Sequence, residues 1–234
     1  MSEALDKVRG VRELPLFPLP LVLFPGVPLP LHIFEERYRR LLADVRASNS
    51  LFGLSYFVPE TSAEDRPEVG HIGCATEVIE VQPLPDGRSN IMTLGVVRYR
   101  VEEYVERGDP YLVARVEFFE DEEEDAGVVE RRAEEVTEMF MRIARAMRTA
   151  NDERGTLPEL PQGDPERLSF VVAAVVEMDA ESKQRLLELR STAERLRRLY
   201  TLLAEAVSSY EERARTHELA RGNGHAGKKI DLEE

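Results

Sequence analysis

The segment Gly222–Lys229 contains the glycines and the lysine of a phosphate-binding loop, so it is the first place where chemistry could reside. In that motif a Ser or Thr hydroxyl follows the lysine and binds magnesium, but here Lys229 occupies that position. No strand pattern precedes the segment and no apolar helix pattern follows it, although the loop needs both to fix its amides around phosphate. The sequence therefore predicts a solvated tail and no nucleotide cofactor.

The spacing of histidine and cysteine does not predict a metal site. His217-Glu218 begins a pattern typical of zinc-protease helices, but Arg221 occupies the position of the second histidine ligand. The other histidines are scattered at His32, His71 and His225. Cys74 is the single cysteine, which excludes an intramolecular disulfide, favours a reducing compartment and is typical of a small buried side chain. We expect no metal and no other cofactor.

A catalytic nucleophile and an acid–base pair are also missing from the sequence pattern. Gly53–Phe57 has a serine two residues after a glycine, but Phe57 replaces the second glycine of a nucleophile elbow. The adjacent carboxylates Glu102 and Glu103 face opposite sides of a strand. The acidic run Glu120–Asp125 is typical of a solvated linker, and the alternative function for it is the attraction of basic peptides. We predict no catalytic residue and no enzyme, with a hydrolase of unrecognised site as an alternative left open.

Charge and composition narrow the class of partner. The 234 residues include 31 Lys and Arg against 45 Asp and Glu, a formal net charge of −14. Nucleic acids and anionic membranes repel such a surface, because their affinity for proteins depends on basic side chains. No stretch approaches the ~20 apolar residues of a membrane span, and the polar N-terminus lacks the apolar core of a secretion signal. We expect a globular cytoplasmic protein with neither nucleic acid nor membrane as its partner.

The first half of the chain has the alternation typical of strands, and the second half repeats apolar residues every three or four positions, as helices do. The predicted strands are Glu13–Phe17, Leu29–Ile33, Leu51–Val58, Gly70–Leu84, Ser89–Val105 and Tyr111–Phe119, and the one helix among them is Glu35–Arg46. Six prolines between residues 15 and 30 predict that the first strands are short, bent or at an edge, because proline donates no ladder hydrogen bond.

The two longest predicted strands flank Pro85–Gly87, where Asp-Gly supplies the positive φ of a tight hairpin. In the second of these strands Val97 and Tyr99 alternate with Arg98 and Arg100. We therefore expect one face of the strand to be buried and the face with the arginines to be wet.

Helix signals continue through the second half. A long amphipathic helix spans Val129–Met147, Asp164-Pro165 begins the next helix, Asp179 caps a short one, and Ser191–Glu194 is a capping box for the last. We predict a β-rich subdomain over residues 1–119, an acidic linker over 120–125, a helical subdomain over 126–214 and a disordered tail over 215–234.

An ordered set of motifs resembles the N-terminal domain of the Lon protease family. The motifs are Leu14–Leu16, Leu23–Pro25, Pro28–Leu31, Val69-Gly70 followed by Ile72, Pro85–Gly87, the Gly-x-x-Arg-x-Arg strand Gly95–Val101, Leu186–Leu189 and Glu194–Leu196. The resemblance covers roughly residues 10–212. It implies an α+β fold, with a PUA-like β-barrel or sheet subdomain containing one helix, followed by a C-terminal α-helical bundle.

The same resemblance implies a role in substrate recognition and assembly. Lon proteases continue into an ATPase module and a Ser-Lys protease, whereas this sequence has neither a valid phosphate-binding loop nor a protease segment. We expect a non-catalytic module that binds unfolded or degron-bearing polypeptides as an adaptor. It would act as a homo-oligomer or together with a protease in trans.

Candidate peptide contacts lie in and near the proline-broken stretch Leu19–Leu31, since a guest strand could add beside an incompletely paired edge. The candidates are Leu23, Phe24, Pro25, Phe34, Tyr56 and Phe57. Each is also compatible with plain core packing. The alternative function is RNA binding by the PUA-like fold, which the acidic charge disfavours. Its basic residues would be Arg37, Arg39, Arg40, Arg98 and Arg100.

Overall fold

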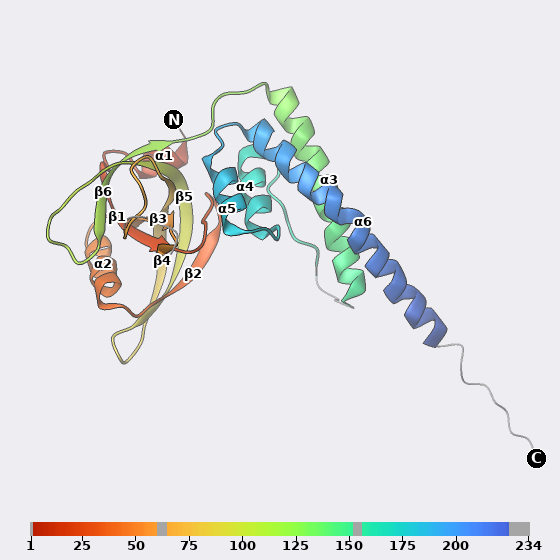
Figure 1. The fold of residues 1–234 in the computed structure, drawn as a ribbon, viewed down its shortest axis with the longest axis horizontal. Helices are drawn as coiled ribbons and strands as arrows, with labels where there is room; N and C mark the ends of the chain where they lie inside the picture. Colours follow the sequence, from red (N-terminus) through yellow and green to blue (C-terminus); the bar gives the residue numbers. More distant parts are fainter. Residues whose placement is uncertain (1, 60–64, 152–155, 225–234) are drawn as a thin grey trace, which may run out of the picture. The chain divides into compact units, whose positions relative to one another are not determined.

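Residues 2–59, 65–151 and 156–224 are described by the computed structural model, in which they form six strands and six helices (Figure 1). The helices are α1 (Glu3–Lys7), α2 (Glu36–Arg46), α3 (Ala126–Ala150), α4 (Pro165–Val175), α5 (Ala180–Glu188) and α6 (Thr192–Gly224). Packing divides the described residues into a sheet unit, within 2–123 and 170–191, and a helix unit, within 124–169 and 192–224. This division differs from the predicted helical subdomain over 126–214, because residues 170–191 pack with the strands.

The six strands form one sheet in the order β2-β5-β4-β3-β1-β6. They are β1 (Glu13–Leu19), β2 (Pro28–Ile33), β3 (Leu51–Tyr56), β4 (Ile72–Pro83), β5 (Ser89–Tyr104) and β6 (Leu112–Phe119). β1 and β3 are parallel and the other pairs are antiparallel. Because β5 also pairs with β6, five strands form a closed circuit of pairings, and β2 lies outside it against the first half of β5. The predicted α+β class is confirmed, and each predicted strand end lies within two residues of the observed one.

Tyr99 of β5 is at the centre of the apolar core of the sheet unit. Its ring is fully buried, and its hydroxyl shares a 2.7 Å hydrogen bond with the hydroxyl of Ser55. Gly53 and Gly73 leave room for the ring, since a Cβ at either position would come within 2.7 Å of it. The serine of the incomplete nucleophile elbow is therefore a buried packing partner, out of reach of a substrate. A second cluster lies under α2, which buries Tyr38, Leu41, Leu42 and Val45.

Arg98 is buried with only 1% of its surface exposed, so the prediction that it faces water is wrong. Its guanidinium donates to the carbonyl of Leu187 at 3.1 Å and pairs with the buried carboxylate of Asp121. The rings of Phe119 and Phe170 lie 4.8 and 5.3 Å from its Cζ atom. The alternation correctly placed Arg98 on the opposite face of β5 from Val97 and Tyr99. That opposite face, which we assigned to solvent, is covered by α5 and the end of α4.

Glu122 to Asp125 of the acidic run are exposed to solvent, whereas the side chain of Asp121 is buried. The side chain of Asp121 is 5% exposed and compensates the charge of Arg98. In the helix unit, the carboxylate of Glu124 accepts a hydrogen bond from the N–H of Ala193 at 3.1 Å, and Asp125 caps the first turn of α3. Acidic residues at a helix N-terminus are favourable, because they accept from unpaired backbone donors there.

The helix unit is built on α3 and α6, which lie side by side and run in the same direction (Figure 1). Their facing surfaces bury residues at spacings of three, four and seven, which is the pattern of paired helices. These residues are Ala133, Val136, Ile143 and Ala146 on α3, and Leu196, Leu199, Leu203 and Val207 on α6. α6 continues to Gly224, ten residues beyond the predicted end at 214, whereas residues 225–234 of the predicted tail lie outside the described residues.

Candidate functional site

The six predicted peptide contacts separate into buried and accessible side chains. Leu23 and Phe24 are 3% and 1% exposed, so in this structure they belong to the core and are not available to a partner. The ring of Phe24 packs 6.0 Å from that of Phe170. Phe34 is 59% exposed. Pro25, Tyr56 and Phe57 are partly exposed.

Gly95 explains why the stretch before β2 is held so firmly. A Cβ atom at this position would lie 2.2 Å from the carbonyl oxygen of Phe24. The N–H of Gly26 donates to the carbonyl of Gly95 at 2.8 Å, and the N–H of Gly95 donates to that of Val27 at 3.0 Å. The first glycine of the Gly-x-x-Arg-x-Arg pattern is therefore required for close backbone approach.

The outer edge of β2 is a poor template for a guest strand. The carbonyl of Val27 accepts from Gly95 of β5. Hydrogen-bonding positions alternate along an antiparallel pair, so Pro28, Pro30 and His32 direct their backbone polar groups away from β5. Two of these three outward positions lack an N–H group, and such prolines discourage strand addition. The expectation that a guest strand adds at this edge is therefore not favoured.

A cavity of about 610 Å³ brings one predicted contact, Phe57, together with aromatic residues that lie far from it in the sequence. Phe57 follows β3, and its N–H donates to the carbonyl of Leu19 at the end of the parallel neighbour β1, at 2.9 Å. Further walls come from the start of α2, from the segment before β6, and from Pro59 and Asp65. The lining includes Pro18, Leu19, Pro20, Glu35, Arg37, Tyr38, Phe57, Asp109, Pro110, Tyr111 and Leu112.

Hydrogen bonds and ring contacts fix the aromatic walls of this cavity. The hydroxyl of Tyr111 donates to the carboxylate of Asp44 at 2.8 Å. Burial, and then this hydrogen bond, raise the pKa of Tyr111, while the same bond lowers the pKa of Asp44. Burial also raises the pKa of Tyr38, whose ring lies 4.5 Å below the guanidinium of Arg37. Both phenols are thus protonated at neutral pH, when they can donate hydrogen bonds but cannot act as bases.

This chemistry suits the binding of an apolar side chain. The cavity is lined by aromatic, proline and leucine side chains together with the charged residues Glu35, Arg37, Asp65 and Asp109, and binding pockets commonly combine apolar walls with a few polar groups. Sequence analysis identified Phe57 but missed Tyr38 and Tyr111 as its neighbours. Tyr38 followed the pattern of the core face of a helix, and Tyr111 began a strand. Tyr38 and Tyr111 become neighbours of Phe57 only through the strand pairings, so no spacing in the sequence indicates this contact.

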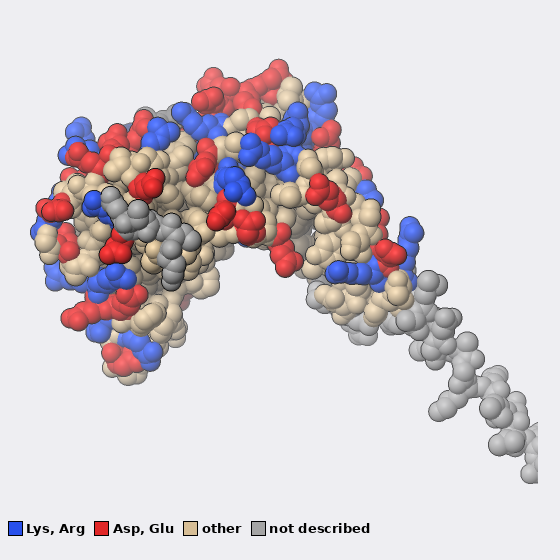
Figure 2. All heavy atoms as spheres, viewed as in Figure 1, with Lys and Arg blue, Asp and Glu red and all other residues tan. Residues whose placement is uncertain are grey.

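The basic residues of the alternative RNA-binding hypothesis do not form one surface. Arg98 is buried. Three others lie within salt-bridge distance of carboxylates, namely Arg37–Glu35 at 2.8 Å, Arg40–Asp44 at 2.9 Å and Arg100–Glu117 at 3.6 Å. Figure 2 shows basic and acidic side chains interspersed on the face in view. This arrangement offers little net positive potential to a phosphate backbone.

Two further comparisons with the sequence analysis concern metals and membranes. Within residues 2–59, 65–151 and 156–224, no three His, Cys, Asp or Glu side chains are placed to hold a metal ion. Among the same residues, no helix has both the length and the apolar character that a membrane crossing requires. Most of the loop-like segment Gly222–Lys229 lies outside the described residues, and its first three residues end α6.

The sheet with its packed helices, the parallel helix pair and the aromatic cavity define an α+β domain. The family model of the ATP-dependent protease La (LON) substrate-binding domain matches residues 13–205. The chain therefore belongs to the family of Lon substrate-binding domains, and the resemblance inferred from the sequence motifs is confirmed.

Known relatives agree with this assignment. The chain is 26% identical over 201 residues to Lon protease 2 of Herpetosiphon aurantiacus, and 27% identical over 199 residues to a Lon protease of Brevibacillus choshinensis. These matches cover 85% and 83% of this chain but 24% and 25% of the relatives, so the chain spans about a quarter of their length.

Solved structures show the same fold. The N-terminal domain of a Mycobacterium avium complex Lon protease has a TM-score of 0.63 at 18% identity, with 82% of this chain and 98% of that chain covered. A Lon N-terminal domain protein from Xanthomonas campestris has a TM-score of 0.58 at 22% identity, with the same coverage.

Proposed function

We propose that the sheet unit binds apolar segments of unfolded or degron-bearing polypeptides and catalyses no reaction on them. The observation that carries this proposal is the aromatic cavity around Phe57 in a chain of the Lon substrate-binding family. Phe34 would supply a further contact, because it is 59% exposed and the next residue, Glu35, lines the cavity. Of the original candidates, Pro25 and Tyr56 remain secondary contacts, and Leu23 and Phe24 support them from the core.

The cavity indicates weak and permissive binding. Burying one Phe or Leu side chain stabilises a complex by about 1.5–3 kcal/mol before the cost of ordering the bound chain. A partner with several exposed apolar side chains would therefore bind better than one with a single such side chain.

Fluorescence anisotropy with a labelled, permanently unfolded protein tests the proposal. We expect saturable binding by the intact chain and at least tenfold weaker binding by Phe57→Ser, because a polar side chain removes the apolar wall. The matched control is Ile79→Ser, since Ile79 is 53% exposed on the same unit but does not line the cavity. Equal affinities of the two variants, with circular dichroism showing both folded, would exclude this cavity as the site.

We further propose that the bound polypeptide is presented to a protease in trans in the cytoplasm, so that the chain acts as an adaptor. The family assignment supports this role, because full-length Lon relatives carry the domain over about a quarter of their length. Adding the chain to a purified Lon protease should accelerate degradation of the unfolded protein, and Phe57→Ser should abolish the acceleration. A homo-oligomer acting alone is the competing arrangement, and analytical ultracentrifugation distinguishes it.

A further inference from the structure

We infer that the helix unit carries a second, independent binding groove, which takes a basic polypeptide segment with apolar side chains at alternate positions. The groove lies between α3 and the segment 157–165, with a cavity of about 1110 Å³. Every lining residue belongs to the helix unit. The inference does not depend on the proposed function of the sheet unit.

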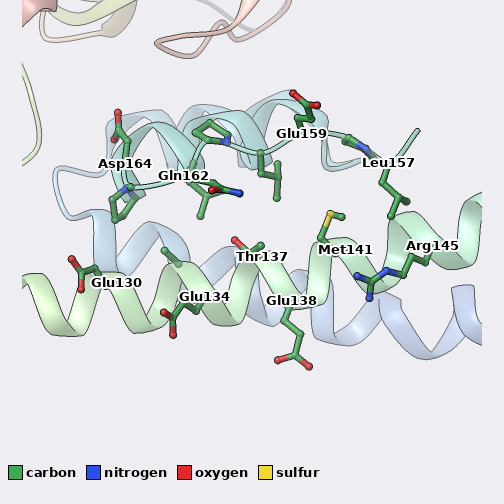
Figure 3. A pocket seen from close by; sticks show the side chains of 17 residues that line it. Glu130, Glu134, Thr137, Glu138, Met141, Arg145, Leu157, Glu159, Gln162 and Asp164 are labelled. Atoms are coloured by element: carbon green, nitrogen blue, oxygen red, sulfur yellow. The ribbon is translucent and has the colours of Figure 1, made fainter. Parts of the chain in front are cut away.

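The floor of the groove is apolar. Figure 3 shows Thr137 and Met141 pointing from α3 toward the segment 157–165, from which Leu157 points back toward the helix. Ala133, Leu160 and Leu168 also line this space. Met is flexible and polarisable, so such a floor accommodates apolar side chains of different shapes.

The margins of the groove are acidic on both sides. Glu130, Glu134 and Glu138 follow one another at every fourth position of α3, and Glu159 and Asp164 belong to the opposite side. Figure 3 shows Glu134 and Glu138 pointing away from the floor, so their carboxylates remain in solvent at the margin.

Asp164 accepts a hydrogen bond from the N–H of Arg167 at 3.0 Å in the first turn of α4, but no basic side chain among the described residues neutralises these carboxylates. No ion pair between described residues involves any of the five, and Arg145 is the one basic residue in the lining. A groove lined by one sign of charge attracts ligands of the opposite sign. Nucleic acids and acidic peptides are therefore disfavoured as occupants.

The two acidic margins and the apolar floor together specify the occupant. Side chains of an extended segment alternate between two directions, so apolar residues can enter the floor while Lys or Arg residues reach the carboxylates. A second copy of this chain is a poor occupant, because it presents the same acidic margins and carries the same net charge of −14.

Binding of a short fluorescent peptide that alternates leucine and lysine tests the inference. We expect saturable binding that weakens as salt is raised, because the contributing charges are exposed. The triple variant E130Q/E134Q/E138Q should bind at least tenfold more weakly, and Met141→Asp should also weaken binding. A peptide that alternates leucine and glutamate should not bind measurably.

The matched control is E135Q/E205Q/E212Q, which removes three exposed charges of the same unit that do not line the groove. Equal weakening by both triple variants would show that the peptide is attracted by net charge alone, and would contradict the groove as its binding site. Concentration-dependent self-association that only the first triple variant abolishes would also overturn it, in favour of a second copy. Binding of a neutral unfolded protein should be unchanged in E130Q/E134Q/E138Q, which separates this site from the Phe57 cavity.

Discussion

The sheet unit and the helix unit each contain an apolar depression, but they support it in different ways. In the sheet unit, five strands pair in a closed circuit, and the walls of the Phe57 cavity come from several of its elements. In the helix unit, one wall of the groove is a helix and the other is the irregular segment 157–165. The first site is therefore shaped by long-range pairing, and the second by one helix and one loop.

This difference predicts different mobility. Segments with few buried apolar contacts and few backbone hydrogen bonds open more easily than paired strands. The Phe57 cavity should therefore be largely preformed, whereas segment 157–165 should adjust to its ligand.

Arg98→Ala should destabilise the sheet unit by about 3–5 kcal/mol, because it removes the guanidinium that compensates the buried carboxylate of Asp121. It also leaves the carbonyl of Leu187 without that donor. Hydrogen exchange should show faster opening of β5 and β6, and a smaller change in α6. The helix unit has its own apolar contacts, so its amides should retain most of their protection.

Arg100→Ala is the matched control on the same strand. The side chain of Arg100 is 41% exposed and its carboxylate partner lies 3.6 Å away, so we expect a loss of about 1 kcal/mol or less. If the two alanine variants were equally stable, the network around Arg98 would contribute no more than a surface ion pair.

Leu199→Ala should destabilise the helix unit by about 2–4 kcal/mol. Leu199 is fully buried between α6 and α3, and its truncation leaves a cavity in a narrow apolar stripe. Exchange of α3 and α6 amides should accelerate while that of β5 changes little. The exposed neighbour Leu202 provides the control, and Leu202→Ala should cost well under 1 kcal/mol. Equal acceleration in β5 would show that the two units open together.

The elements of both units were accessible from the sequence, but the tertiary environment of individual side chains was not. Alternation placed Val97 and Tyr99 correctly in the core, and the Asp179 cap was found with its short helix. The burial of Arg98 was not predicted, because Leu187, whose carbonyl accepts from it, lies 89 positions later in the sequence. Helix α1 was also missed, since five residues are too few to show a period.

The candidate site shows the same limit. Phe57 was identified because it is a large apolar residue at the end of a strand. Its neighbours Tyr38 and Tyr111 were not, because only the β1–β3 and β1–β6 pairings bring the three chain segments together. The acidic groove of the helix unit was not predicted from the sequence for another reason. Its glutamates are spaced like any solvated helix face, and the opposite wall is a loop without a periodic signal.

The sheet unit should lose stability in mild acid through His71. Burial lowers the pKa of His71 from its ordinary value of 6.5 to about 4, and no described residue bonds its buried Nε2 atom. Between these values the unfolded chain binds more protons than the folded chain, so the free energy of unfolding falls as pH falls from about 6.5 to 4. We expect this group to contribute about 2–3 kcal/mol to that fall.

Urea unfolding at a series of pH values measures this contribution. His71→Gln should flatten the curve between pH 6.5 and 4, because glutamine does not titrate there. His32→Gln, at an exposed position of the edge strand β2, is the control for the general effect of replacing a histidine by glutamine. An unchanged curve in His71→Gln would assign the acid sensitivity to carboxylates instead.

The smallest expected effect concerns the ion pair that joins the two helices of the helix unit. The Nε and Nη2 atoms of Arg142 donate to one carboxylate oxygen of Glu211 at 3.0 and 2.9 Å, but both side chains are more than a third exposed. A double-mutant cycle with Arg142→Ala and Glu211→Ala should therefore give a coupling energy of about 1 kcal/mol or less, decreasing with salt.

Two parallel helices with a uniform apolar stripe can slide by a turn at little cost, and a polar contact across them opposes the slide. We therefore expect the alanine variants to retain most of their stability while the exchange protection along α3 and α6 becomes less even. Coupling well above 1 kcal/mol would place this pair with the Arg98 network, and the contrast between the two units would then disappear.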